Sequence, residues 1–380
     1  MKKSPLIKIK GVIPLEEYSA NSVDLWLSTG IDPVDFLVNY KQGCGGIPAG
    51  RITQIFGPES SGKSTLLAHI IKAALDRDIQ TFLFDVENTF DKDFAGRIGL
   101  DTKRVGMVVD DSGHPIKSIE DFIQRFHEVS VAYFEETKEG PDDKKVKIRK
   151  PDTPLILALD SIAALDVEDM LQKKGGGYTK PKRQVANIAR TWGPFYSNVL
   201  LPLQKKYKNL TFIALNQLRT NIKTSMFSSE PSEVTPGGRA IKYYASLDLR
   251  VDRIKGLLNE AKHYAPYAVV TRVKVHKSKV GSPEVSCYVY NGLKRGFDNA
   301  KSVMWFLVDN GILRKPAGVP QLYNCEEFTV PDLGDGFHGP LAGRKLKVAK
   351  LTLGDAQIMY DQYGWDALVE PIRKVMESDI

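Results

Sequence analysis

The sequence predicts an α/β fold with a mainly parallel central sheet flanked by helices. Three observations lead to this prediction. Between about residues 31 and 290, short apolar runs bounded by polar turns alternate with amphipathic stretches, a pattern typical of parallel strands covered on both faces. One apolar run leads directly into a glycine-rich loop and then into a helix-like segment. Another apolar run ends in an aspartate.

Five apolar runs are predicted to be strands of this sheet. Their sequences are ITQIF (52–56), TFLFD (81–85), VGMVV (105–109), LILALD (155–160) and TFIALNQ (211–217). The charge-rich segment 135–152 interrupts the pattern, and we interpret it as a solvated surface insertion. A chain of 380 residues is long enough for one large domain followed by a small one.

Composition is that of an ordinary globular protein, with 42% hydrophobic and 26% charged residues. No stretch approaches the roughly 20 apolar residues of a membrane span. The N-terminal sequence MKKSPLIKIKG lacks the apolar region of a signal peptide. Three widely spaced cysteines predict a reducing compartment, the cytoplasm, without a disulfide framework. The net charge of +7 is compatible with nucleic-acid binding but does not demonstrate it.

The segment GPESSGKS (57–64) matches the phosphate-loop pattern G-x-x-x-x-G-K-S, and both flanks fit the strand–loop–helix context that the pattern requires. Backbone N–H groups and the start of the following helix form an anion site. Lys63 is expected to reach the β- and γ-phosphates of ATP, and the Ser64 hydroxyl to hold Mg²⁺. The residues expected to bind ATP in this segment are Gly57, Glu59, Ser60, Ser61, Gly62, Lys63, Ser64 and Thr65.

Two carboxylates follow predicted strands. Asp160 ends LILALD, where it can hold Mg²⁺ opposite Ser64. Glu87 ends FLFDVE, at the sheet edge where ATP hydrolysis needs a base for the attacking water. The pattern around Glu87 is equally compatible with a surface glutamate at a turn, and Asp85 is the nearest alternative base.

Asn216 and Gln217 end the run TFIALNQ. A neutral amide at this position can bond the γ-phosphate and lose that bond on hydrolysis, and so report the state of the nucleotide. The segment 218–238 that follows is rich in Ser, Thr, Asn, Pro and Gly. A loop of this length inside a compact domain is usually functional.

A second loop, 168–183, contains KKGGGYTKPKR (173–183). Flexible backbone, positive charge and an aromatic ring are typical of a groove for single-stranded nucleic acid, although a solvated loop has the same composition. The residues that we expect to contact DNA in this loop are Lys173, Lys174, Tyr178, Lys180, Lys182 and Arg183.

Together these segments resemble the RecA family of homologous recombinases. The resemblance also rests on STGIDPVDFLV, LILALDSIAAL, ALNQLRTNI, TPGGRAIKYYASLDLRV and RVKVHKSKVGSP, which occur in the family's order. It implies an N-terminal segment that contacts a neighbouring subunit (1–29), a RecA-like ATPase core (30–295) and a small α/β C-terminal domain (296–380). It also implies an ATP-dependent recombinase that forms a helical filament on single-stranded DNA, pairs it with homologous duplex DNA and exchanges strands.

The resemblance assigns roles within the ATP site. Glu87 matches the family's catalytic glutamate and Gln217 its γ-phosphate sensor. Asp91 and Phe94 fall where the family contacts adenine. Lys277 and Lys279 match a lysine pair that reaches the ATP of the neighbouring subunit and stabilises charge on the transferred phosphoryl group.

The resemblance also assigns DNA and subunit contacts. The loop 168–183 matches the first DNA-binding loop, and 218–238 matches the second. Within the second loop, the resemblance implies that Arg219, Gly237 and Gly238 contact phosphates. It also implies that the Ile222 side chain inserts between base triplets. Subunit contacts are implied for Lys242 and Tyr243.

The chain departs from the family at several places, which predicts a divergent member, and we interpret it as phage-encoded and active in the cytoplasm of a bacterial host. Only a short apolar run (6–9) stands where bacterial members have a long docking helix, and the acidic tail is missing. The basic run GRKLKVAK (343–350) is compatible with a duplex DNA site or with plain surface. Two alternatives remain: a hexameric DNA helicase on the same core, and a non-catalytic recombination mediator.

Overall fold

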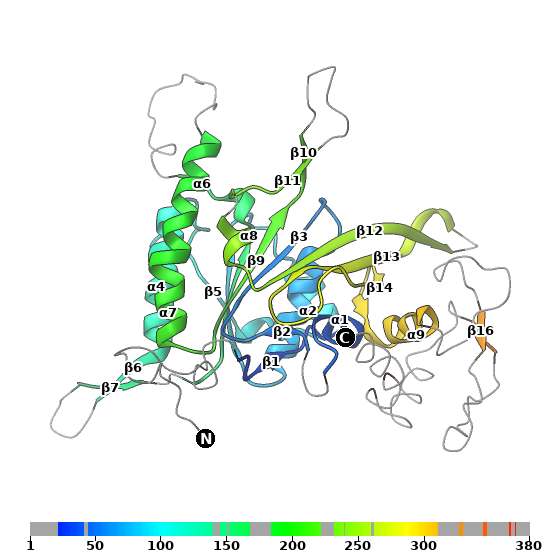
Figure 1. Ribbon diagram of the computed structural model, residues 1–380, viewed down its shortest axis with the longest axis horizontal. Helices are drawn as coiled ribbons and strands as arrows, with labels where there is room; N and C mark the ends of the chain where they lie inside the picture. Colours follow the sequence, from blue (N-terminus) through cyan, green and yellow to red (C-terminus); the bar gives the residue numbers. More distant parts are fainter. Residues whose placement is uncertain are drawn as a thin grey trace, which may run out of the picture.

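A computed structural model describes residues 22–41, 45–139, 145–149, 152–167, 184–221, 232–238, 240–259, 262–310, 327–329 and 345–347, with Trp365 and Val369. At its centre lies a nine-stranded sheet of order β15-β14-β13-β12-β3-β9-β8-β4-β5 (Figure 1). The strands of this sheet are β3 (Ile52–Gly57), β4 (Gln80–Asp85), β5 (Val105–Met107), β8 (Leu155–Asp160), β9 (Leu210–Gln217), β12 (Leu247–Asn259), β13 (Lys262–Ser278), β14 (Ser286–Gly292) and β15 (Gly296–Asp298).

The six strands from β12 to β5 pair in parallel, whereas β13, β14 and β15 continue the sheet in antiparallel pairs. The predicted mainly parallel α/β fold is therefore confirmed. In the central strands β8 and β9 nearly every residue is buried, because helices cover both faces of this part of the sheet. The run 105–109 is shorter than predicted, since only Val105–Met107 pairs as a strand.

Helices cover the two faces of the sheet. One face packs against α1 and α2, and the other against α4, α6 and α7. The bounds of the helices are α1 (Asp32–Val38), α2 (Lys63–Leu75), α3 (Lys92–Arg97), α4 (Ile119–Phe134), α6 (Gln184–Pro194), α7 (Leu201–Lys206), α8 (Ala240–Tyr244) and α9 (Asn299–Asp309). A π-helical turn, Phe195–Leu200, joins α6 to α7.

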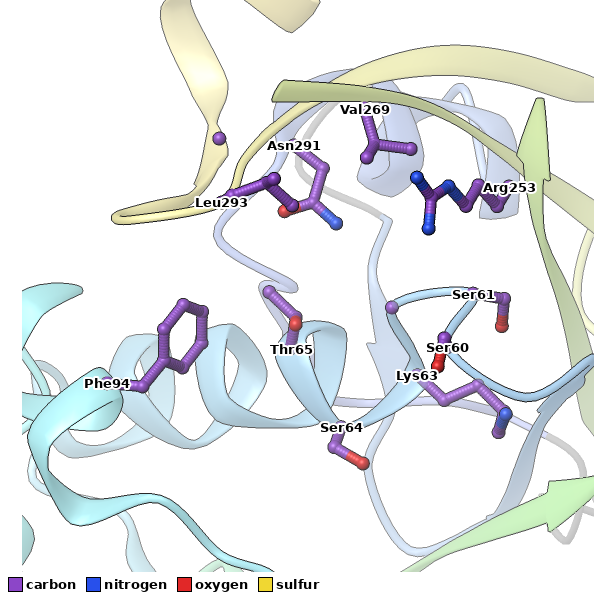
Figure 2. A pocket seen from close by; sticks show the side chains of 12 residues that line it. Ser60, Ser61, Lys63, Ser64, Thr65, Phe94, Arg253, Val269, Asn291 and Leu293 are labelled. Carbon is purple, nitrogen blue, oxygen red and sulfur yellow. The ribbon is translucent and has the colours of Figure 1, made fainter. Parts of the chain in front are cut away.

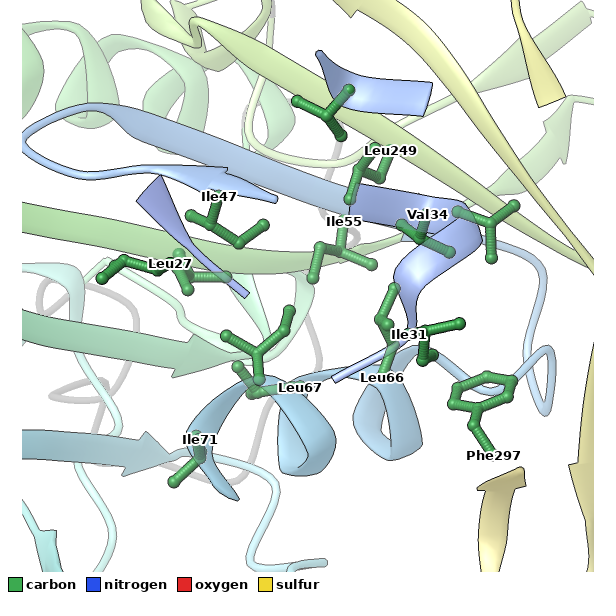
Figure 3. Packing of buried hydrophobic residues seen from close by; sticks show 14 of the residues in the cluster. Leu27, Ile31, Val34, Ile47, Ile55, Leu66, Leu67, Ile71, Leu249 and Phe297 are labelled. Carbon is green, nitrogen blue, oxygen red and sulfur yellow. The ribbon is translucent and has the colours of Figure 1, made fainter. Parts of the chain in front are cut away.

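The two core layers differ in composition. Under α2 the core is aliphatic: Leu66 and Leu67 face Ile55 of β3 and Leu249 of β12 (Figure 3). On the opposite face the core is aromatic, with the rings of Phe122, Phe126, Trp192, Phe195 and Phe212 in mutual contact. This aliphatic layer holds α2, the helix that follows the phosphate loop, in position against the sheet, because apolar residues recur along the side of α2 that faces the sheet.

Within the described residues, four strand pairs lie outside the main sheet. The charged insertion contributes β6 (Glu135–Glu139) and β7 (Lys145–Arg149), which pair with each other and project from the core (Figure 1). The other pairs are β1 (Trp26–Leu27) with β2 (Ile47–Pro48), β10 (Arg219–Asn221) with β11 (Ser232–Val234), and β16 (Glu327–Thr329) with β17 (Lys345–Lys347).

Several predicted segments lie outside the described residues. These are residues 1–21 of the N-terminal segment, the first loop, 168–183, with all six of its predicted DNA contacts, residues 222–231 of the second loop, which include Ile222, and most of 296–380. In the part of the chain that the structure describes, none of the helices combines the length and the apolar character needed to cross a membrane.

Candidate nucleotide site

The phosphate loop joins β3 to α2 and needs glycine at two positions. A Cβ atom on Gly57 would lie 2.0 Å from the carbonyl oxygen of Val251 on β12. Gly62, the N-cap of α2, has φ 102°, a conformation that L-residues rarely adopt. The predicted strand–loop–helix context is confirmed, and it leaves the N–H groups at the start of α2 available to an anion.

Lys63 is folded back into the loop. Its side chain is buried, and its Nζ donates a hydrogen bond to the Pro58 carbonyl oxygen at 2.6 Å. Burial lowers the pKa of Lys63, and the nearby carboxylates of Asp160, Glu87 and Glu59 oppose that shift. The amine is thus already in the loop, where a phosphate oxygen can replace a single carbonyl partner.

Ser64 and Asp160 meet as the sequence predicted. The Ser64 hydroxyl donates to Asp160 Oδ2 at 2.8 Å. Burial raises the pKa of Asp160 to about 6; the Ser64 hydrogen bond and Lys63 oppose the shift, whereas Glu87 and Asp85 add to it. A half-buried carboxylate beside a hydroxyl is a ligand set that suits Mg²⁺. Among the described residues no group of three or more His, Cys, Asp or Glu could hold a metal ion, so Mg²⁺ here would need phosphate and water oxygens as further ligands.

Glu87 and Gln217 lie together, although they come from different strands. Glu87 Oε1 accepts from the Ser161 hydroxyl at 2.5 Å and from Gln217 Nε2 at 3.2 Å. The sequence reasoning missed Ser161; a hydroxyl residue directly after Asp160 was the available signal. The competing base, Asp85, accepts from the backbone N–H groups of Thr89 and Phe90. Its carboxylate therefore folds the turn after β4, which leaves Glu87 as the candidate base.

A chain of hydrogen bonds runs from Glu87 to the second loop. The side-chain amide of Gln217 bonds Glu87, and the backbone N–H of Gln217 donates to Asn216 Oδ1 at 3.0 Å. Asn216, which is fully buried, donates through Nδ2 to the Pro236 carbonyl oxygen at 3.0 Å. Pro236 precedes Gly237 and Gly238, which have φ of 83° and 76°. The candidate base and the end of the second loop are therefore connected by hydrogen bonds that pass through the side chain and backbone N–H of Gln217 and through the side chain of Asn216.

A pocket of about 320 Å³ opens over the phosphate loop (Figure 2). Seven of its lining residues carry predicted nucleotide roles: Ser60, Ser61, Gly62, Lys63, Ser64, Thr65 and Phe94. Five were missed: Arg253, Val269, Asn291, Gly292 and Leu293. An Asn-Gly pair after an apolar strand was the only local signal for this second group.

Other predicted nucleotide contacts do not line this pocket. The residues Gly57, Glu59, Asp91 and Asp160 are absent from its wall. Asp91 instead caps helix α3, because its Oδ1 accepts from the Phe94 N–H at 2.8 Å. That bond fixes the position of Phe94 at one end of the pocket, so Asp91 positions an aromatic residue of the wall.

Lys277 and Lys279 do not line the pocket either. Lys277 Nζ donates to the carbonyl oxygens of Lys242 and Ala245, and Lys279 Nζ donates to the Tyr243 carbonyl oxygen. Both amines thus satisfy carbonyl groups at the end of α8. Burial lowers the pKa of Lys277, and Asp248 opposes that shift. Tyr243 on the same helix is 68% exposed, so this corner of the molecule presents a ring and two amines together.

Comparison with known proteins adds a decisive observation. The family model of the RecA N-terminal domain matches residues 10–135 and 148–291, which is well over half of the chain. The chain belongs to the RecA family. The match omits residues 136–147, where this RecA-family protein has most of the β6–β7 hairpin, so the hairpin is an addition to the family core.

Proteins named Protein RecA are its relatives among curated sequences. Identity is 32% over 241 residues with that of Solidesulfovibrio magneticus, 30% over 280 residues with that of Tropheryma whipplei, and 30% over 334 residues with that of Kineococcus radiotolerans. These matches cover 63%, 73% and 85% of this chain. The chain spans 58%, 55% and 81% of the length of the relatives, little more than half for the first two.

A solved structure, that of the RadB recombinase, is also similar to this RecA-family protein. The TM-score is 0.43 and the sequence identity 18%, with 71% of this chain and 98% of the other chain covered.

Proposed function

We propose that this RecA-family protein is a DNA-dependent ATPase that forms helical filaments on single-stranded DNA and catalyses homologous pairing and strand exchange in recombination and DNA repair. The observation that carries the proposal is the hydrogen-bonded chain from Glu87 through Gln217 and Asn216 to Pro236. It joins a candidate catalytic base to the end of a predicted DNA-binding loop. An ATP site that serves DNA binding needs such a connection.

In the proposed reaction Glu87 takes a proton from the water that attacks the γ-phosphorus, and ADP and phosphate are the products. Lys63 leaves the Pro58 carbonyl oxygen and bonds the β- and γ-phosphates. Ser64 and Asp160 would hold Mg²⁺, which would neutralise charge on the phosphates. Phe94 lies at the end of the pocket that would hold the adenine ring, and packs on that ring.

Gln217 is the proposed switch. Its side-chain amide donates to Glu87 in this structure, and when ATP is bound it would exchange this acceptor for a γ-phosphate oxygen. A movement of Gln217 displaces Asn216 and its bond to the Pro236 carbonyl oxygen. ATP thereby orders the second loop for DNA, and hydrolysis releases it.

Electron microscopy with single-stranded DNA and a non-hydrolysable ATP analogue tests the proposal. We expect helical filaments that require both DNA and the analogue. Closed rings that unwind a forked duplex would instead favour a hexameric helicase. An absence of any assembly, together with binding to another recombinase, would favour a non-catalytic mediator.

Lys277→Ala tests whether the two lysines act on the neighbouring subunit's ATP. We expect DNA-stimulated ATP hydrolysis to fall by at least about tenfold, because a cation at the transferred phosphoryl group is lost. Nucleotide binding by the monomer should be unchanged, since Lys277 does not line its own pocket. Lys274→Ala on the same strand is the control, because Lys274 forms a surface ion pair with Glu284.

Mixing variants makes this test sharper. In a head-to-tail filament, each ATP site would take Glu87 from the subunit that holds the ATP and Lys277 from its neighbour. Both groups are intact where a Lys277→Ala subunit holds the ATP and the neighbour is Glu87→Gln. In an equal mixture this arrangement occurs at about a quarter of the sites, which should therefore recover activity. Recovery requires that the lysine act across the interface. If Lys277→Ala alone keeps full DNA-stimulated turnover, the role in the neighbouring site is wrong. Thermal unfolding of each variant shows whether loss of the α8 contacts disturbs the fold.

A further inference from the structure

Arg253 is placed on the nucleotide side of the sheet by the alternation of β12. Leu249 and Val251 of β12 are buried in the core beneath α2, and Arg253 continues this row because alternate residues share a face. The pairing with β13 shifts between Arg253 and Lys255, which leaves Ile254 without a partner. A bulge of this kind bends the strand and redirects the side chains beside it, and bulges are common next to active sites.

Arg253 is exposed, and within the described part of the chain its guanidinium makes no hydrogen bond or ion pair. The adjacent carboxylate, Asp252, points to the other face and is held there by Arg250 Nε at 3.0 Å and Arg272 Nη2 at 2.8 Å. An arginine that keeps its full charge and five donors at the wall of a pocket is suited to a phosphate.

The position of Arg253 in the pocket indicates which part of a ligand it meets. Figure 2 shows its guanidinium across the pocket from Ser60 and Ser61, at the end away from Phe94. Phe94 suits a base, and the loop suits phosphates. Asn291, which is almost buried, extends from β14 into the space between them. Arg253 therefore faces the polyphosphate end of the pocket, opposite the loop that carries Lys63.

We propose that Arg253 binds the polyphosphate of the nucleotide held by its own subunit, from the side opposite the phosphate loop. Phosphates entering the pocket would then lie between two cations of the same chain, Lys63 and Arg253. This inference rests on the proposed ATP site and adds a residue to it. It differs from the role proposed for Lys277 and Lys279, because Arg253 lines the pocket of its own chain, whereas the two lysines are proposed to act on the ATP of a neighbouring subunit.

The test measures ATP and AMP affinities of the monomer with Mg²⁺ and without DNA, by displacement of a fluorescent ATP analogue. We expect Arg253→Gln to weaken ATP binding by about tenfold or more, because a hydrogen-bonded charge is lost. AMP binding should be unchanged, since AMP lacks the β- and γ-phosphates. Arg253→Lys should be intermediate, because an ammonium keeps the charge and loses the fork of donors.

Arg295→Gln is the matched control. Arg295 is also an exposed arginine, lies three residues beyond Gly292 of the pocket wall and is not itself part of that wall. If Arg253→Gln and Arg295→Gln bind ATP as tightly as the unaltered protein, and Lys63→Ala does not, the inference about Arg253 is overturned and the ATP site stands. An equal loss for ATP and AMP would also overturn it. If the unaltered protein fails to bind ATP, the proposed function fails as well.

Discussion

Replacing Glu87 with glutamine is expected to lower ATP turnover by about two to four orders of magnitude, the usual contribution of a general base. Glutamine has nearly the same shape, and its Oε1 can still accept from Ser161 and Gln217 as Glu87 does. The hydrogen-bonded chain to the second loop is therefore kept while the base is lost. Binding of ATP and of single-stranded DNA should remain.

The measurement is steady-state ATP hydrolysis with and without single-stranded DNA, alongside equilibrium binding of both ligands. Glu128→Gln on the outer surface of α4 makes the same chemical change in an exposed pair with Arg125, and should hydrolyse ATP at the unaltered rate. Equal rates for Glu87→Gln and the unaltered protein would remove Glu87 from its role. The base would then have to be sought elsewhere, since the Asp85 carboxylate is already bound by two backbone N–H groups.

Lys63→Ala is expected to weaken Mg–ATP binding by roughly a hundredfold or more, because charge-assisted hydrogen bonds to two phosphates are lost together. The fold should survive in the absence of nucleotide, since Lys63 gives up only one hydrogen bond to a carbonyl oxygen. Isothermal calorimetry and thermal unfolding separate the two effects.

Lys72→Ala provides the control on the same helix. Lys72 forms a surface ion pair with Asp76 at 2.6 Å, and such pairs contribute about 0–1 kcal/mol. Its ATP affinity should equal that of the unaltered protein. Tight ATP binding by Lys63→Ala would show that the phosphate loop is not the nucleotide site.

The parts of the site that the sequence predicted are those encoded within a few adjacent residues. The phosphate loop, Asp160 and Glu87 each follow an apolar strand, and parallel strands bring their carboxyl ends to one edge of the sheet. The position of Asp160 opposite Ser64 was therefore predicted from the phosphate-loop pattern and from an aspartate at the end of an apolar run, and the two side chains do form a hydrogen bond. The pairing of Glu87 with Gln217 was implicit in the same argument, because β4 and β9 end at that edge.

The opposite wall of the pocket could not be predicted in this way. Arg253 and Asn291 come from strands far along the chain, and Leu293 from the turn after β14; they fold beside the phosphate loop only through the antiparallel part of the sheet. Alternation along β12 puts Arg253 on the nucleotide side of the sheet, but no residue pattern in β12 predicts the bulge that follows Arg253. In the sequence, Lys277 and Lys279 look like ordinary alternating residues of a basic strand. Their hydrogen bonds to carbonyl groups at the end of α8 form only because the folded chain brings α8 beside this strand.

The hairpin formed by β6 and β7 is a place where the chain should tolerate insertions and deletions. Its first and last paired residues, Glu135 and Arg149, lie side by side, so the excursion leaves and rejoins the core at one place. Changes of length between them are therefore expected to alter neither the path of α4 nor the entry into β8. Homologues can therefore differ in length at this hairpin. A fluorescent protein inserted between β6 and β7 should leave the ATP site unchanged.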